Sequence, residues 1–203
     1  MVYQLQRPQR PSALEAVRSP SPNAGVAAAG LNRSRSVMSL ASMTWSLEGT
    51  VQVFTCPHRS FFSGVMAQAL RLAGQGTSVL VVQFMKGGIG QGYDRPMQFA
   101  QNLDWVRCDW TRCVDSPQVT EEEARSLVDL WQYTKRVVTE GQYEMVVLDE
   151  LSVAMQFGLI PPVEVLDFIR KRPKHIDVIL TGPDMPDVIL DVADQITELR
   201  RNN

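Results

Sequence analysis

Two adjacent acidic residues, Asp149 and Glu150, follow the apolar run MVVL at residues 145–148. An acid at the carboxyl end of a buried strand can hold Mg²⁺, directly or through water, and a glutamate beside it can orient a water molecule. Acids in this place can instead cap the helix that follows the strand. The pair lies in the second half of an alternating pattern of strands and helices, which favours the magnesium role. We therefore predict Asp149 and Glu150 as Mg²⁺ ligands, with helix capping as the alternative.

A lysine follows a second apolar run. Residues 78–84, SVLVVQF, are typical of a parallel strand that is covered on both faces, and Lys86 with two glycines comes shortly after them. A lysine on a glycine-bearing loop suits a phosphate or carboxylate ligand. We predict that Lys86 contacts phosphate, and a solvated turn lysine is the alternative.

The loop CPHRSFFSG at residues 56–64 lies between the β-type run VQVFT and a helix-like stretch, where a nucleotide-binding protein carries its phosphate loop. The loop holds no lysine, and its first glycine is Gly64. A helix N-terminus still offers an anion free N–H groups and the positive end of the helix dipole. Arg59, Ser60 and Ser63 are therefore predicted to contact phosphate, and Ser60 is also a candidate N-cap of the helix.

Strands that alternate with helices must position these residues. Apolar runs predict the strands, amphipathic spacing predicts the helices, and Thr120 with Glu123 forms the sequence pattern of a capping box. This alternation predicts an α/β fold built from parallel β-α-β units with right-handed crossovers. Ligands of such sheets bind beyond the carboxyl ends of the strands, where the candidate residues fall. The expected strands are 51–55, 78–84, 103–109, 143–151, 177–182 and 195–199. The expected helices are 61–74, 120–141 and 162–172, with a helical turn or more at 185–193.

Composition excludes several classes of protein. The chain has 203 residues, of which 44% are hydrophobic and 21% charged, which suits a single folded domain with a tail. A net charge of −2 is unlike a nucleic-acid-binding protein. No apolar run approaches the roughly 20 residues that a membrane helix needs. Three cysteines are too few for a disulfide framework and indicate a reducing compartment, so we expect a cytoplasmic protein.

The first 43 residues differ from the rest of the chain. Residues 1–42 hold five arginines, no lysine and one acid, which gives them a charge of +4. The net charge of the chain is −2, so the remaining residues carry −6. The segment is rich in Pro, Ser, Ala and Arg and has little to bury, so we predict a disordered tail at 1–43 before an α/β domain at 44–203. An organelle transit peptide and a true start at Met43 are alternatives.

Four sequence blocks resemble the P-loop corrinoid adenosyltransferases over residues 51–199. The blocks are QFMKG, YEMVVLDELSVAMQFGLIPPVEVLDFIRKRP, VILTG and ADQITEL. The resemblance implies a P-loop NTPase-like parallel sheet with helices on both faces. It implies the family reaction of cobalamin biosynthesis, in which the adenosyl group of ATP moves to the reduced cobalt of a cob(I)alamin-type corrinoid and triphosphate is released. ATP, Mg²⁺ and a corrinoid are then the expected ligands, and a homodimer the expected assembly.

The chain departs from the family at the phosphate loop. The family has Gly-x-Gly-Lys-Gly-Lys-Thr-Thr where this chain has residues 56–63, so Phe61 and Phe62 stand in place of the phosphate lysine and the Mg²⁺-binding hydroxyl. Pro57 removes a backbone donor, and Pro183 follows LTG where the family has arginine. Burying triphosphate beside aromatic rings costs several kcal/mol. We expect the two rings to fill the triphosphate pocket and ATP binding to be weak or lost.

These departures leave two hypotheses for the activity. The chain is either an adenosyltransferase that uses ATP and Mg²⁺ or a non-catalytic pseudoenzyme, without a cofactor, that serves as an interaction or regulatory module for a protein partner. The cysteines and His58 could form a repurposed metal site, and the alternative is that the thiols are simply buried. Three tryptophans could form an apolar dimer contact, and the alternative is that they pack in the core. The metal candidates are Cys56, His58, Cys108 and Cys113, and the tryptophans are Trp105, Trp110 and Trp131.

Overall fold

The structure is a computed structural model that describes residues 48–88 and 92–200. The predicted tail and its transit-peptide and start-site alternatives fall outside the described residues. The domain boundary at residue 44 therefore stays a prediction.

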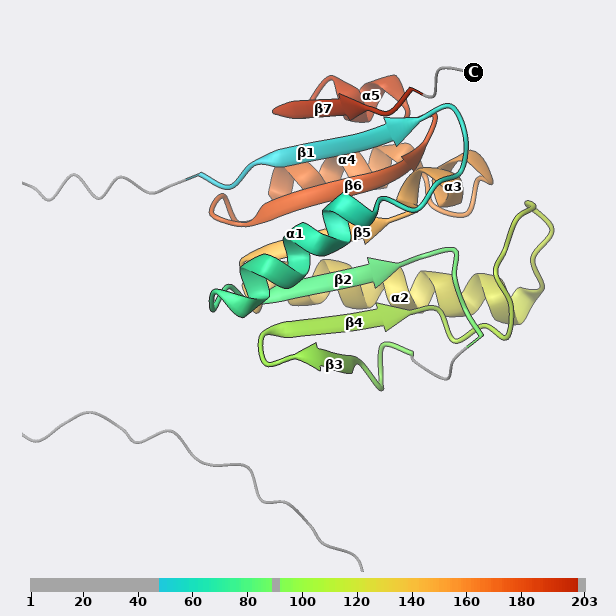
Figure 1. The fold of residues 1–203 in the computed structure, drawn as a ribbon. Helices are drawn as coiled ribbons and strands as arrows, with labels where there is room; N and C mark the ends of the chain where they lie inside the picture. The colour runs from blue at the N-terminus through green and yellow to red at the C-terminus, as the bar shows by residue number, and fades with distance from the viewer. Residues whose placement is uncertain (1–47, 89–91, 201–203) are drawn as a thin grey trace, which may run out of the picture. The chain divides into compact units, whose positions relative to one another are not determined.

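A seven-stranded sheet forms the centre of the described part of the chain, in the order β3-β4-β2-β5-β6-β1-β7 (Figure 1). Every neighbouring pair is parallel except β3 and β4, which are antiparallel. This arrangement confirms the predicted α/β class. The strands are β1 (Val51–Cys56), β2 (Val79–Gln83), β3 (Met97–Ala100), β4 (Leu103–Arg107), β5 (Met145–Asp149), β6 (Asp177–Pro183) and β7 (Gln195–Glu198).

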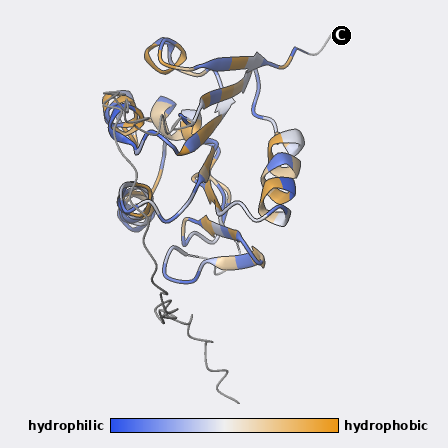
Figure 2. Ribbon diagram, turned by 90° about the vertical axis from the view of Figure 1, so that its left-hand side faces the viewer, coloured by the Kyte–Doolittle hydropathy of each residue, from blue (hydrophilic) through white to orange (hydrophobic). Residues whose placement is uncertain are grey.

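Helices cover both faces of the sheet, as expected (Figures 1 and 2). One face carries α1, and the opposite face carries α2 and α4. Among the described helices, none is long and apolar enough to cross a membrane. The helices are α1 (Ser63–Gly74), α2 (Glu121–Thr139), α3 (Leu151–Gln156), α4 (Pro162–Lys171) and α5 (Asp187–Leu190).

The central strands are apolar throughout because both of their faces are buried. Every residue of β2 and β5 is buried. Successive side chains of β2 enter opposite layers, since Val79 and Val81 pack with α1 residues while Leu80 and Val82 pack with α2 residues. The continuous apolar runs in the sequence therefore reflect a sheet enclosed between two helical layers.

Helix α2 begins where the capping box predicts. The Thr120 hydroxyl accepts a hydrogen bond from the Glu123 N–H, and the Glu123 carboxylate accepts one from the Thr120 N–H. Three glutamates occupy the first turn and Arg136 lies in the last turn, so both ends complement the helix dipole.

Several local predictions are corrected. Ser60 does not cap α1, because the helix begins at Ser63 with Phe62 as N-cap and without a side-chain cap bond. The segment 185–193, expected to form a helical turn or more, does form the single turn α5. Strand β3 and helix α3 were not predicted. The strand expected at 143–151 ends at Asp149, because Glu150 adopts a left-handed conformation with φ of 59° and α3 follows at once.

Candidate functional site

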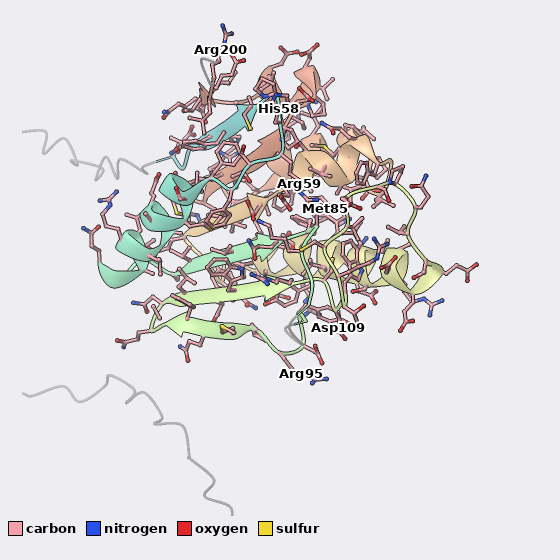
Figure 3. The ribbon with its side chains drawn as sticks, turned by 45° about the vertical axis from the view of Figure 1, so that its right-hand side comes forward. His58, Arg59, Met85, Arg95, Asp109 and Arg200 are labelled. Carbon is pink, nitrogen blue, oxygen red and sulfur yellow. The ribbon has the colours of Figure 1, made fainter. Side chains whose placement is uncertain are left out.

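The carboxyl ends of the parallel strands meet along one edge of the sheet (Figures 1 and 3). Strands β1 and β5, which carry the loop at 56–64 and the acidic pair, are separated by β6 alone. Arg59 lies near Met85 at this edge (Figure 3). The fold thus brings together the candidate residues in the region where open α/β sheets bind their ligands.

Asp149 is a fully buried carboxylate with a complete set of donors. Its Oδ2 accepts hydrogen bonds from Gln83 Nε2 at 2.7 Å and from Lys86 Nζ at 3.0 Å. Its Oδ1 accepts a hydrogen bond from the Thr181 hydroxyl at 2.8 Å. Both oxygens of the predicted Mg²⁺ ligand are therefore engaged by protein groups.

Gln83 belongs to this network although it was not predicted as a site residue. Its Oε1 accepts hydrogen bonds from Trp105 Nε1 at 2.9 Å and from Arg107 Nε at 2.6 Å. The amide therefore links β4 to Asp149 on β5 across the intervening strand β2. The sequence signal for this role was a single polar residue that ends an otherwise apolar buried strand.

Glu150 forms a bidentate ion pair with Arg59. Arg59 Nε lies 2.7 Å from Glu150 Oε1, and Nη2 lies 2.7 Å from Oε2. The side chain of Glu150 is 4% exposed and that of Arg59 is 31% exposed. Hydrogen bonding to Glu150 raises the pKa of the Arg59 guanidinium above its ordinary value, against the opposing effect of burial. Arg59, which was predicted to contact phosphate, is therefore bound to Glu150, which was predicted as a Mg²⁺ ligand.

The left-handed backbone of Glu150 is strained, because φ values near +60° are unfavourable for residues with a Cβ. The Thr181 hydroxyl accepts a hydrogen bond from the Glu150 N–H at 3.1 Å, and Arg59 holds its carboxylate. Strain of this kind persists only where the surrounding structure enforces it. The conformation directs the glutamate side chain toward the loop after β1.

Lys86 supplies the second cation of the cluster. Its Nζ lies 3.0 Å from Asp149 Oδ2, 3.9 Å from Glu150 Oε1 and 4.9 Å from the centroid of the Phe61 ring. Arg59, Lys86, Asp149 and Glu150 thus form an internally neutral group of two cations and two carboxylates, here called the ion-pair cluster.

The two phenylalanines of the loop point into different surroundings. Phe62 is 3% exposed and packs edge-on against Phe54 at a centroid distance of 6.3 Å, in the core layer beneath α1. Phe61 is 55% exposed, and the ammonium group of Lys86 lies over its ring. The expectation that both rings fill one pocket is wrong, because only Phe62 is buried.

The two serines of the loop lie at the start of α1. Ser63 is the first helical residue and is exposed, while Ser60 is half-buried. No hydrogen bond joins either hydroxyl to the ion-pair cluster within the described residues. Phosphate contact by these serines stays a prediction.

The cysteine and histidine residues do not form a metal centre. Cys56 Sγ donates to the carbonyl oxygen of His58, and the buried Cys108 Sγ donates to the carbonyl oxygen of Phe84. Burial raises the pKa of the Cys108 thiol, which disfavours the thiolate that a metal requires. Within residues 48–88 and 92–200, no group of three or more His, Cys, Asp or Glu side chains is placed to hold a metal ion.

Two of the candidate tryptophans belong to the core. Trp110 is 4% exposed and Trp131 is 3% exposed, and Trp131 packs edge-on against Phe84 and Phe168. Core packing, the alternative to a dimer contact, therefore applies to both of these residues.

The parallel sheet, the loop after β1 and the acids at the end of β5 define an α/β protein of the P-loop NTPase type. The family model for ATP:corrinoid adenosyltransferase BtuR/CobO/CobP matches residues 47–203, and the chain belongs to this family. The resemblance found in the sequence is thereby confirmed.

Curated relatives agree with this assignment. The chain is 32% identical over 152 residues to corrinoid adenosyltransferase CobA of Salmonella typhimurium, and the match covers 75% of this chain and 76% of that protein. It is 30% identical over 152 residues to the corrinoid adenosyltransferase of Escherichia coli K12, with the same coverage of 75% and 76%. An uncharacterized protein of Nostoc sp. is 25% identical over 168 residues, which cover 76% of this chain and 44% of that protein.

Proposed function

We propose that this chain is a corrinoid adenosyltransferase-family protein whose triphosphate site is closed by its own side chains, so that it binds MgATP weakly and adenosylates a corrinoid slowly. The family reaction transfers the adenosyl group of ATP to a cob(I)alamin-type corrinoid in cobalamin biosynthesis. One observation carries the proposal: both carboxylate oxygens of Glu150 are held by Arg59.

The ion-pair cluster is a poor fit to Mg²⁺ and triphosphate. Mg²⁺ takes oxygen ligands in strict octahedral geometry, and its predicted ligands Asp149 and Glu150 already accept hydrogen bonds at all four oxygens. Leaving one partner of a buried ion pair uncompensated costs about 3–5 kcal/mol, and the partial exposure of Arg59 lowers this figure. A cost of half this size would still weaken MgATP binding by about tenfold or more.

The loop backbone also supports weak phosphate binding. A phosphate loop directs consecutive N–H groups inward around the anion. In this chain Pro57 has no N–H, the Ser63 N–H donates to the Phe61 carbonyl at 3.0 Å, and the Val65 N–H donates to the Phe62 carbonyl at 3.0 Å. Fewer donors therefore remain for a triphosphate than in a glycine-rich loop.

A non-catalytic interaction module is the second candidate function. The observation that favours it is the exposed Phe61 ring, which Lys86 covers on one side beside the ion-pair cluster. A solvent-exposed aromatic ring at the place of a ligand suits contact with a protein partner. We also propose a cytoplasmic homodimer, from the family resemblance and from three free cysteines, which suit a reducing compartment.

Calorimetric titration of MgATP into the wild-type protein tests the main proposal. We expect a Kd at least about tenfold weaker than the micromolar range of an ordinary nucleotide site. Micromolar binding that disappears in an Asp149→Ala, Glu150→Ala double variant would contradict the proposal, because those acids would then hold the metal.

Formation of adenosylated corrinoid separates the two candidate functions. The corrinoid is reduced to the cobalt(I) state, ATP is added at saturating concentration, and the product is followed by its absorption spectrum. Slow turnover above the protein-free rate supports a weak enzyme. Turnover equal to the protein-free rate, in a sample whose circular dichroism is that of the folded protein, supports the interaction module.

A further inference from the structure

Arg59 joins four separate chain segments at the carboxyl edge of the sheet. It belongs to the loop after β1 and binds the Glu150 carboxylate at the start of α3. Its Nη1 donates to the Val114 carbonyl at 2.7 Å, in the loop after β4, and its Nη2 donates to the Met85 carbonyl at 3.2 Å, in the loop after β2. These four hydrogen bonds connect segments that are between 26 and 91 residues from Arg59 in the sequence.

Only a guanidinium can make this set of contacts. Its planar fork directs N–H groups to both oxygens of a carboxylate while the remaining N–H groups reach other acceptors. The Met85 carbonyl also accepts a hydrogen bond from the Val114 N–H at 3.1 Å, and the Gly88 N–H donates to the Trp110 carbonyl at 2.6 Å. The loops after β2 and β4 are therefore held to each other as well as to Arg59.

We propose that Arg59 is an internal substitute for the ligand that would otherwise order these loops. A bound ligand stabilises the loops that contact it only when its concentration exceeds its Kd, and the stabilisation then grows with the logarithm of that concentration. A side chain of the same chain is present at a high effective concentration, so its contacts hold the loops without any external ligand. The inference rests on the proposed function, because a site that is closed from within retains its loop arrangement when no nucleotide is bound.

Amide hydrogen exchange of an Arg59→Ala variant tests the inference. The expected result is a loss of protection at the Val114 and Gly88 amides of about tenfold or more, the factor that corresponds to one lost hydrogen bond to a charged group. Protection of the Asp177 amide, which donates to Glu144 at the opposite end of the sheet, is expected to stay unchanged. Equal protection in the variant and the wild type at Val114 and Gly88 would overturn the inference.

Arg112→Ala is the matched control. Arg112 also forms a bidentate pair, with Glu123, and lies in the same loop as Val114, but its side chain is 43% exposed. Loss of its surface pair is expected to leave the Val114 and Gly88 amides protected. An equal loss in both variants would show that any arginine of this region has the same effect, which contradicts a specific role for Arg59.

Chemical rescue separates the ligand-like role from general destabilisation. Guanidinium at a concentration far below denaturing levels is expected to restore protection and melting temperature to the Arg59→Ala variant, while sodium chloride at the same concentration is not. Guanidinium without any advantage over sodium would overturn the inference. Should Arg59→Ala not fold, Arg59→Lys keeps the charge without the fork, and full protection of Val114 and Gly88 in that variant would also overturn it.

The experiments can contradict the proposed function and the role of Arg59 independently of each other. Unchanged protection in Arg59→Ala with weak MgATP binding in the wild type removes the ligand-substitute role and leaves the proposed function. Micromolar MgATP binding by the wild type removes the proposed function, whatever the exchange data show.

Discussion

The Gln83 amide donates to Asp149 at 2.7 Å while its oxygen accepts hydrogen bonds from Trp105 and Arg107. The two donors and the carboxylate acceptor determine the orientation of the amide, because the reversed amide would place its NH₂ against donors. A polar chain therefore runs from β4 through β2 to the buried acid on β5. Asp149 is therefore held by Lys86 and by Gln83, whose amide is itself bound by two side chains of β4.

Gln83→Leu should lower the free energy of unfolding by about 1–3 kcal/mol, because it removes one of the two hydrogen bonds to Asp149 Oδ2 and the acceptor of the Trp105 and Arg107 bonds. Urea unfolding followed by circular dichroism measures the change. Gln98→Leu, on the exposed strand β3, is the control and should stay within about 0.5 kcal/mol of wild type. Equal losses in the two variants would mean that the amide network contributes no specific stability.

The adjacent phenylalanines should respond differently to truncation. Phe62→Ala leaves a cavity beneath α1 and should cost about 3–5 kcal/mol of unfolding free energy, because the ring is 3% exposed. Phe61→Ala should cost less than about 1 kcal/mol, because the ring is 55% exposed. Urea unfolding of both variants checks this difference. A large loss for Phe61→Ala would show that its ring packs against the protein in solution.

The Arg112–Glu123 pair should make the stability depend on pH in the acid range. Hydrogen bonding from Arg112 lowers the pKa of Glu123 below its ordinary value of 4.5, and the Thr120 N–H acts in the same direction. A lowered folded-state pKa contributes stability that is present above pH 4.5 and is lost as pH falls through the lowered pKa. Glu123→Gln should therefore reduce the urea midpoint slightly at pH 7 and lose that difference in acid.

Urea midpoints of the wild type and Glu123→Gln across this pH range provide the measurement. Glu121→Gln, in the same helical turn, is the control for removal of one negative charge near the helix N-terminus. A constant difference between wild type and Glu123→Gln at every pH would contradict the assignment to the ionised pair.

The three cysteines should differ in reactivity. Cys113 is exposed, Cys56 and Cys108 are buried, and burial raises the pKa of the Cys108 thiol. A thiol-specific reagent at neutral pH should label Cys113 first, and all three cysteines should react after denaturation. Mass spectrometry identifies the labelled site, with Cys113→Ser as control. Rapid labelling of Cys108 in the native protein would contradict its burial.

Local sequence signals predicted the elements that depend on neighbouring residues. The capping box at Thr120 and Glu123 located the start of α2, and the run at 78–84 located β2. Both signals span only a few residues, so they can be recognised without the rest of the chain. Strand β3 carried no comparable signal, because it has four residues that are mostly exposed and depends on antiparallel pairing with β4.

The sequence by itself determined the α/β class, the family and the chemical content of the site, because apolar periodicity, caps and motif order are local properties of the chain. Only the tertiary structure decided that Arg59 faces Glu150 rather than solvent or a ligand, and that Gln83 joins β4 to Asp149. Residues 59 and 150 are 91 positions apart, so their contact depends on strand order and loop path. Those properties arise from packing of the whole sheet, which no short stretch of residues encodes.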